Sequence, residues 1–326
     1  MDKILIIKPS SLGDIVHTLP AVHFLKQTFP NSKISWVINS EWAPLLSENA
    51  DVDSVIAFPR LGFRGPAGPL RFFSWSRQLA KLRPDLVLDF QGLLRSAWMA
   101  RSSKGGRILG LSDAREGAHW FYTERVVVDS RQHAVDRYLE LAKLAGSEIA
   151  GPALFPLPEG KAIRDFECPA RAVILHPFAR GAGKSLTGDE VFQLSRLLAP
   201  LPVIVVGKSD EDLRLDRNAI SLVNETSLEE LIWLLRRAAF IISVDSGPMH
   251  MAAGLTANLL SIHLWSDPRC VGPYNPDAWV WKDNQIIQVR SLGERSFAAR
   301  LSSRPAPLQI ARFVHDRLEG GAHGLR

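Results

Sequence analysis

The chain has 326 residues, of which 46% are hydrophobic and 22% are charged, a balance typical of globular proteins. At roughly 150 residues per domain the length predicts two domains, and no apolar run reaches the ~20 residues that a membrane-spanning helix requires. The net charge of +5 favours an anionic partner, such as a phosphorylated substrate or an acidic membrane surface. No nucleic-acid-binding motif accompanies this charge, so we expect no nucleic-acid partner.

The first half of the chain begins with MDKILIIKPSSLGD, a short apolar run that Ser, Gly and Asp interrupt. This pattern predicts no signal peptide, and we expect a cytoplasmic protein. Short β-branched runs then alternate with helical patterns. The predicted strands of this half lie at 3–8, 34–39, 52–58, 86–91 and 107–111. Such alternation predicts a parallel sheet with helices on both faces.

Pro and Gly accumulate between residues 147 and 160, where the periodicity stops, so this stretch is predicted to be a linker. The alternation then resumes. Strands are predicted at 172–178, 202–208, 219–224, 240–245 and 259–264, and a helix at 307–318. The predicted fold class is α/β, with two Rossmann-like domains facing across a cleft. One domain spans residues 1–160 and the other 161–326, and the candidate site residues are those that follow the strands.

The first strand is followed by a turn, Ser10-Ser11-Leu12-Gly13, and by a helix that is predicted to open at about Asp14. A carboxylate at the carboxyl end of this strand, beside the amides of a helix start, is suited to act as a general base. Gly13 permits a close approach or a positive φ. The alternative is that Asp14 only caps the helix, which contributes about 1 kcal/mol to stability.

A second pattern, HPFARGAGKSLTGDEVFQL, joins a strand, a glycine-rich turn and a helix. Gly181 and Gly183 would expose backbone amides, and Lys184 would place a cation against phosphate oxygens. A P-loop would require Gly at position 178, where this chain has Phe178. A nucleoside triphosphatase is nevertheless an alternative, because the strand that ends at Asp245 resembles the one that holds Mg²⁺ in such enzymes. A flexible surface turn is a third interpretation.

The strongest pattern is DSGPMHMAA, in which a buried strand ends at Asp245 and the turn Ser246-Gly247-Pro248 leads into a new helix. The free amides at the start of that helix, together with the positive end of its dipole, are suited to a diphosphate. His250 lies one turn into the helix and would add a donor. The alternative for His250 is a satisfied core residue.

Together these motifs resemble the lipopolysaccharide heptosyltransferases, glycosyltransferase family 9, and most closely the heptosyltransferase I type. The resemblance also rests on DLVLDFQGLLRSA, HAVDRYLELAKLAG and SDPRCVGPYN, and so runs nearly end to end. It implies a GT-B fold, an ADP-heptose donor, and inverting transfer to a Kdo-lipid A type acceptor without a metal or another cofactor. HPFARGAGK is more similar to the enzyme that adds the second heptose, which leaves the acceptor open between Kdo and heptose.

By this resemblance Asp14 is the base and Lys184 neutralises the phosphates of the donor, so both are implied to be catalytic. The implied donor-binding residues are Ser10, Ser11, Gly13, Asp212, Asp245, Ser246, Gly247 and His250. Glu211 is the alternative to Asp212 at the nucleotide ribose. The family commonly carries an aromatic residue after its lysine, where this chain has Ser185 and Leu186.

The first third of the chain is rich in Arg and Lys. Arg60, Arg64 and Gln91 are expected to bind the acceptor, whose inner-core sugars and lipid A carry carboxylates and phosphates. The same basic residues favour peripheral contact with the anionic surface of the inner membrane. The alternative is that they form ordinary solvated helix faces.

Overall fold

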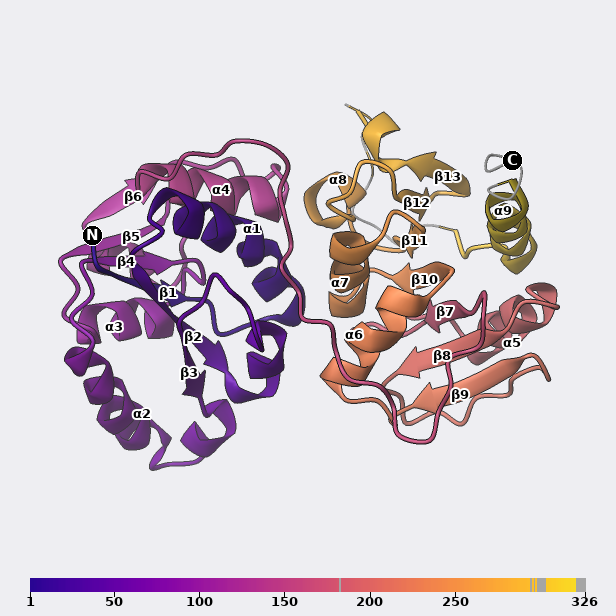
Figure 1. The fold of residues 1–326 in the computed structure, drawn as a ribbon, viewed down its shortest axis with the longest axis horizontal. Coiled ribbons are helices and arrows are strands. Elements are labelled where there is room, and N and C mark those ends of the chain that lie inside the picture. Colours follow the sequence, from indigo (N-terminus) through magenta and orange to yellow (C-terminus); the bar gives the residue numbers. More distant parts are fainter. Residues whose placement is uncertain (182, 294, 296, 298–302, 321–326) are drawn as a thin grey trace. The chain divides into compact units, whose positions relative to one another are not determined.

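The computed structural model describes residues 1–181, 183–293, 295, 297 and 303–320. The chain forms two compact units, Met1–Pro158 and Glu159–Arg326 (Figure 1). The division falls in the stretch predicted to be a linker, and that stretch contains no helix or strand. Within the described residues, no helix has both the length and the apolarity needed to cross a bilayer.

The first unit contains a parallel sheet in the order β3-β2-β1-β4-β5-β6. Its strands are β1 (Lys3–Ile7), β2 (Lys33–Asn39), β3 (Ser54–Phe58), β4 (Leu86–Asp89), β5 (Arg107–Leu111) and β6 (Glu124–Val126). The five strands predicted in this half are confirmed. The sixth, β6, is an additional edge strand of three residues.

Helices cover both faces of this sheet (Figure 1). They are α1 (Leu12–Thr28), α2 (Gly68–Ser76), α3 (Leu94–Ser102) and α4 (Ala134–Leu144), with the 3₁₀ turns η1 (Ser40–Leu46), η2 (Arg60–Phe63), η3 (Arg77–Lys81) and η4 (Ala118–Phe121). Because side chains alternate along a strand, Leu5 and Ile7 point to one face, where Met99 of α3 and Leu79 of η3 complete a core. Helices α1 and α4 pack against each other.

The second unit contains a sheet in the order β13-β12-β11-β10-β7-β8-β9, in which only β13 is shown antiparallel to its neighbour among the described strands. The strands are β7 (Val173–His176), β8 (Val203–Gly207), β9 (Ala219–Val223), β10 (Phe240–Val244), β11 (Leu259–Ile262), β12 (Trp279–Lys282) and β13 (Gln285–Gln288). The five predicted strands of this half are confirmed. The pair β12 and β13 is a hairpin that was not predicted.

The helices of the second unit are α5 (Gly188–Leu197), α6 (Leu228–Arg237), α7 (Gly247–Leu255), α8 (Pro268–Val271) and α9 (Pro307–Gly320). Helix α9 confirms the helix predicted at 307–318. It packs against α5, where Leu194 and Val314 lie in one buried cluster. Helices α6 and α7 pack together (Figure 1). Each sheet is thus buried by helices, as its apolar strands require.

The strand order reverses once in each sheet. In the first unit the chain runs outward through β1, β2 and β3 and then returns to β4 on the other side of β1. In the second unit it runs through β7, β8 and β9 and returns to β10 on the other side of β7. At such a switch point the connections leave in opposite directions, and ligands bind at the carboxyl ends of the two strands. The switch points therefore mark two sets of candidate site positions, the ends of β1 and β4 in the first unit and the ends of β7 and β10 in the second.

Candidate active site

The turn between β1 and α1 holds Asp14 at the first switch point. Ser11 is the N-cap of α1, and Asp14 is the third residue of the helix rather than its first. Asp14 Oδ2 accepts hydrogen bonds from the Ser11 amide at 3.1 Å and from Ser11 Oγ at 2.6 Å. Both bonds run from Ser11 to Asp14, and together with the Ser11 side chain facing the Asp14 amide they form a capping box. The helix, predicted to open at about Asp14, begins at Leu12, because Ser11 supplies the cap.

The other carboxylate oxygen of Asp14 faces a buried polar chain. Tyr138 OH of α4 lies 3.4 Å from Asp14 Oδ1, and Lys8 Nζ donates to Tyr138 OH at 2.8 Å and to the Phe90 carbonyl at 2.9 Å. Burial opposes the charge of Lys8, but Tyr138, Asp14 and Asp89 outweigh it and raise the pKa of Lys8. Lys8 is therefore an ammonium group held beside the carboxylate.

The end of β4 approaches the same turn. The Ser10 amide donates to Gln91 Oε1 at 3.1 Å, so the structure brings Gln91 together with the Asp14 turn. The preceding Asp89 is buried and accepts from Tyr122 OH at 2.7 Å and Ser96 Oγ at 2.8 Å. Burial raises the pKa of Asp89 despite these donors. Asp89 fixes the loop that carries Gln91, since it also accepts the Gln91 amide at 3.0 Å.

Two of the predicted acceptor residues lie apart from this cluster. Arg60 and Arg64 lie at η2, beyond the carboxyl end of β3, and both are exposed. Strand β3 is separated from β1 by β2 in the sheet order. Gly13, by contrast, is buried within the first turn of α1. The first switch point therefore unites Ser10, Ser11, Gly13, Asp14 and Gln91 but neither arginine.

The second switch point carries the DSGPMH turn at the end of β10. Ser246 is the N-cap of α7, and Pro248 lies in its first turn. Because Pro248 has no N–H, Gly247 and Met249 carry the amides of the first turn that no helix carbonyl satisfies. His250 Nε2 lies 4.0 Å from Asp245 Oδ1, with the His250 side chain 8% exposed. The turn is therefore a helix start whose first amides are open to an anion.

His176, at the end of β7, was not predicted to belong to the site. Its Nδ1 lies 3.2 Å from Ser246 Oγ and 3.4 Å from Ser243 Oγ. Burial lowers the pKa of His176 to about 4, so the ring is neutral at pH 7. It ties the start of α7 to β7 across the switch point. The sequence signal was its position, since a polar residue that ends a central parallel strand points at the ligand edge.

The glycine-rich turn after β7 requires its glycines. Gly181 has φ +104° and Gly183 has φ +75°, a region that favours residues without Cβ. A Cβ on Gly183 would also lie 3.2 Å from Trp265 Nε1. Trp265, which follows β11 and is 38% exposed, therefore places an aromatic ring against this turn. The two residues that follow Lys184 in the sequence, Ser185 and Leu186, carry no aromatic ring.

Lys184 lies half-buried in the same turn, and no described residue gives its Nζ a hydrogen bond or an ion pair. Ser185 Oγ anchors the turn by accepting the Ala179 amide at 3.0 Å. Helix α5 begins only at Gly188, where Thr187 and Glu190 form its capping box. In a P-loop the lysine stands at the helix start and the helix amides bind phosphate. Here the helix start is capped by its own side chains, so the turn does not form a P-loop.

Both Asp212 and its alternative Glu211 are exposed in the segment that joins β8 to β9. The Glu211 amide donates to Ser209 Oγ at 3.0 Å. Strand β8 neighbours β7, so this segment follows the carboxyl end of the strand next to the second switch point. No group of three or more His, Cys, Asp or Glu side chains that could hold a metal ion occurs in the part of the chain that the structure describes.

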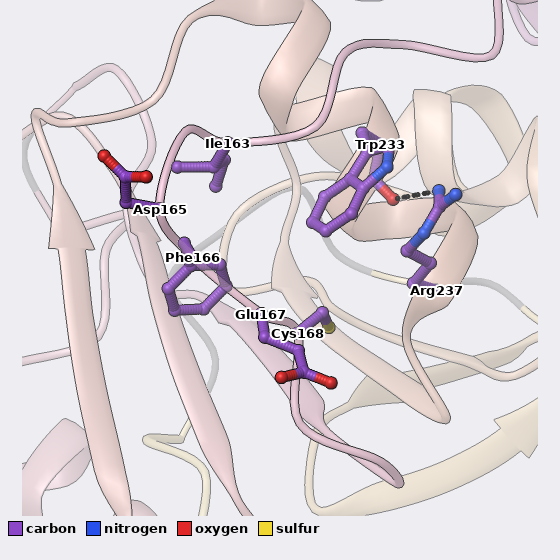
Figure 2. Close-up of a pocket in the computed structure, with 7 residues that line it drawn as sticks. All are labelled: Ile163, Asp165, Phe166, Glu167, Cys168, Trp233 and Arg237. Atoms are coloured by element: carbon purple, nitrogen blue, oxygen red, sulfur yellow. Dashed lines mark hydrogen bonds between the residues drawn. The ribbon is translucent and has the colours of Figure 1, made fainter.

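A cavity of about 550 Å³ lies elsewhere in the second unit (Figure 2). It is lined by Cys168 and neighbouring residues before β7, and by Trp233 and Arg237 at the end of α6. Arg237 Nη1 donates to the Trp233 carbonyl at 3.3 Å. These residues precede β7 and β10, so the cavity adjoins the amino ends of the strands. It is therefore at the edge opposite the switch-point site.

Comparison with known proteins shows the family of this chain. The family described as glycosyltransferase family 9 (heptosyltransferase) matches residues 72–170 and 205–292, more than half of the chain. Lipopolysaccharide heptosyltransferase 1 of Escherichia coli K12 is 30% identical, over 92% of this chain and 99% of the relative. The enzyme of the same name from Pseudomonas aeruginosa is 29% identical, over 83% of this chain and 81% of the relative.

Solved structures show the same fold. The E. coli heptosyltransferase WaaC with ADP has a TM-score of 0.77 at 24% identity, covering 96% of this chain and 99% of that one. E. coli ADP-heptose lps heptosyltransferase II has a TM-score of 0.77 at 19% identity, covering 98% and 99%. The predicted GT-B fold is confirmed, and the triphosphatase alternative has no support. The chain belongs to glycosyltransferase family 9, the heptosyltransferases.

Proposed function

We propose that this chain transfers heptose from ADP-heptose to the Kdo of the lipopolysaccharide inner core, with inversion at the anomeric carbon. The observation that carries the proposal is that a family 9 chain holds a carboxylate at the switch point of its first unit and an open helix start at that of its second. Two structures of one relative, E. coli heptosyltransferase WaaC, support the donor, because they hold ADP and ADP-2-deoxy-2-fluoro heptose.

The second unit, residues 161–326, would bind the donor. The diphosphate would sit at the start of α7, on the amides of Gly247 and Met249, with Lys184 as its counter-charge. As the bond from the anomeric carbon to the diphosphate oxygen breaks, negative charge accumulates on ADP. Lys184 and the α7 dipole stabilise that charge in the transition state. Asp245, Ser246 and His250 would complete the phosphate and sugar contacts, and Asp212 would hold the ribose hydroxyls.

The first unit, residues 1–160, would bind the acceptor. The hydroxyl oxygen of the acceptor attacks the anomeric carbon of the donor on the face opposite the diphosphate, and the configuration at that carbon inverts. Asp14 accepts the hydroxyl proton, a step worth typically 10²–10⁴-fold. Ser11 contacts Oδ2 and Tyr138 contacts Oδ1, so the carboxylate is held in place from both oxygens. Ser10, Ser11 and Gly13 would contact the donor sugar beside the base.

The acceptor is anionic and lipid-linked, and three side chains of the first unit suit it. Gln91 lies beside Ser10 and would bind an acceptor hydroxyl or carboxylate. Arg60 and Arg64 would reach phosphates or carboxylates farther along the acceptor from η2. We place the protein in the cytoplasm, in peripheral contact with the anionic face of the inner membrane.

The proposal is tested with two acceptors. The purified chain is incubated with ADP-heptose and either Kdo-terminated lipid A or the same molecule already carrying one heptose, and ADP release is followed. We expect release with the Kdo-terminated acceptor and little with the other. Release only with the heptose-bearing acceptor would contradict the Kdo assignment. No release with either acceptor would contradict transfer to the inner core.

A further inference from the structure

The first unit carries exposed apolar side chains that its core does not use. Leu70 and Phe73 of α2, Leu94 and Trp98 of α3, and Trp120 of η4 are between 37% and 82% exposed. We call these five residues the apolar strip. Single exposed apolar residues are ordinary, but a set of large ones gathered on one surface marks an interaction site.

The members of the apolar strip lie on adjoining elements. The rings of Phe73 and Trp98 meet edge to face with 5.0 Å between their centroids, and Trp98 Nε1 donates to Ser76 Oγ at the end of α2. Trp98 also lies 6.3 Å from the ring of Phe121, the residue after Trp120. Trp98 therefore links α2 to η4, and the strip crosses three neighbouring elements.

The charge around the strip is mainly positive. Residues 68–121, which include its three elements, contain nine Lys and Arg and four acids, Asp85, Asp89, Asp113 and Glu116. Asp113 forms an ion pair with Arg137. Asp89 is fully buried, and Asp85 binds the Asp2 and Lys3 amides at the amino end of β4. Neither carboxylate is available to a partner at this surface. Glu116 is an acid beside the strip, and it accepts the Leu94 amide at 3.2 Å.

Two of these cations share helix faces with the apolar strip. Arg77 follows Phe73 by four residues and Arg101 follows Trp98 by three, and residues at these spacings lie on one side of a helix. Both arginines are exposed, and no described residue forms an ion pair with either. A surface of aromatic rings flanked by unpaired arginines complements the headgroup region of an anionic bilayer, where tryptophan and basic residues concentrate.

The position of the strip relative to the acceptor site is also informative. Leu94 begins the helix that follows β4, and Trp120 lies after β5, so both stand toward the carboxyl ends of the strands. In a parallel sheet these ends share one edge. That edge holds Asp14. Helices α2 and α3 are neighbours on the same side of the sheet (Figure 1). A bilayer against the strip would lie next to the edge that handles the acceptor.

We propose that the apolar strip, with Arg77 and Arg101, docks the chain on an anionic phospholipid bilayer. The tryptophan rings insert at the headgroup level, and the two guanidinium groups bind lipid phosphates. The inference rests on the proposed function, since a lipid-linked acceptor requires the enzyme to work at a membrane surface. It adds the residues that make the contact.

The test is cosedimentation of the full chain with vesicles of phosphatidylcholine alone or mixed equally with phosphatidylglycerol. We expect binding at least tenfold tighter to the mixed vesicles and weaker in high salt. Leu70→Ser with Trp120→Ser should lower the partition coefficient at least tenfold. Arg77→Gln with Arg101→Gln should lower it about 25-fold, because each cation near the surface is worth about fivefold.

The second unit offers matched controls. Ile220 and Leu308 are 41% and 46% exposed, and Arg217 and Arg312 are exposed as well. One control variant combines Ile220→Ser with Leu308→Ser, and the other combines Arg217→Gln with Arg312→Gln. They remove two exposed apolar side chains and two exposed arginines outside the strip, and both should leave vesicle binding unchanged. All the substituted side chains are exposed, and melting temperatures close to that of the wild type would confirm that the variants fold.

Three results would overturn the proposal. The first is a wild-type chain that does not sediment with the mixed vesicles, and the second is strip variants that bind as well as the controls do. The third is a wild-type dimer in light scattering that the strip variants dissociate, which would make the strip an interface between two copies of the chain. A second assay, transfer of heptose to a Kdo saccharide that carries no lipid, separates the docking proposal from the proposed function. The strip variants should keep this activity. A wild-type chain that lacks it would refute the proposed function but would not refute the docking surface.

Discussion

His176 at the candidate site has a lowered pKa that predicts a measurable pH dependence. It is buried at the end of β7, and its pKa is lowered from 6.5 to about 4. Gln at this position is neutral at every pH and can still hydrogen-bond Ser246. The substitution His176→Gln therefore removes the titration and keeps the polar contact that ties β7 to α7.

The size of the effect follows from linkage. A histidine whose pKa is lower in the folded chain binds fewer protons there than in the unfolded chain. The stability it contributes is fully present above pH 6.5 and is lost as the pH falls toward 4. At pH 5.0 the unfolded chain is almost fully protonated at this site and the folded chain hardly at all. Relative to pH 7.5, the free energy of unfolding should fall by about 2 kcal/mol through this residue alone.

Urea unfolding of wild type and His176→Gln at pH 7.5 and 5.0 measures this difference, because the other titrating groups cancel between the two proteins. We expect the wild type to lose about 2 kcal/mol relative to the variant on going to pH 5.0. An equal difference at both pH values would refute the assignment of a buried, neutral imidazole. His176→Phe, which cannot bind Ser246, should weaken ADP binding where His176→Gln does not.

Three further predictions concern the chemistry. Asp14→Asn should lower kcat about 10²-fold or more with little change in melting temperature, since Asn can still accept the Ser11 amide; near-normal turnover would make Asp14 structural. Lys184→Ala should weaken ADP binding in calorimetry, and an unchanged affinity would remove Lys184 from the site. Transfer should persist in EDTA; a collapse that Mg²⁺ or Mn²⁺ restores would point to a metal-dependent transferase.

The strands could be predicted from the sequence because a buried parallel strand is an unbroken apolar run, as in β1 and β10. The order of the strands in each sheet could not be predicted, because it depends on which strands pair in space. The hairpin of β12 and β13 did carry a local signal. Asp283 and Asn284 form its two-residue turn, with φ of +50° and +63°, and Asp and Asn are the residues that such turns favour. Each of its strands has only four residues, too few for the alternation of a strand to be recognised in the sequence.

Some parts of the candidate site could likewise be predicted from the sequence, and others could not. Asp14 and the DSGPMH turn stand next to strand ends in the sequence, so their place could be predicted from local motifs. The polar chain from Lys8 through Tyr138 to Asp14 could not, because Lys8 and Tyr138 are 130 residues apart and meet only when α4 packs on α1. The contact of Trp265 with the glycine-rich turn could not be predicted either, because Trp265 follows β11 and meets that turn only in the folded chain.

The central claim is that the chain forms a glycosidic bond between heptose and the inner core. Mass spectrometry of Kdo-terminated lipid A, after incubation with ADP-heptose and the purified chain, tests it most directly. We predict that each acceptor gains a single heptosyl residue and that one ADP is released for each residue gained. Release of ADP while the acceptor keeps its original mass would contradict the account, because the chain would then hydrolyse its donor rather than transfer the sugar.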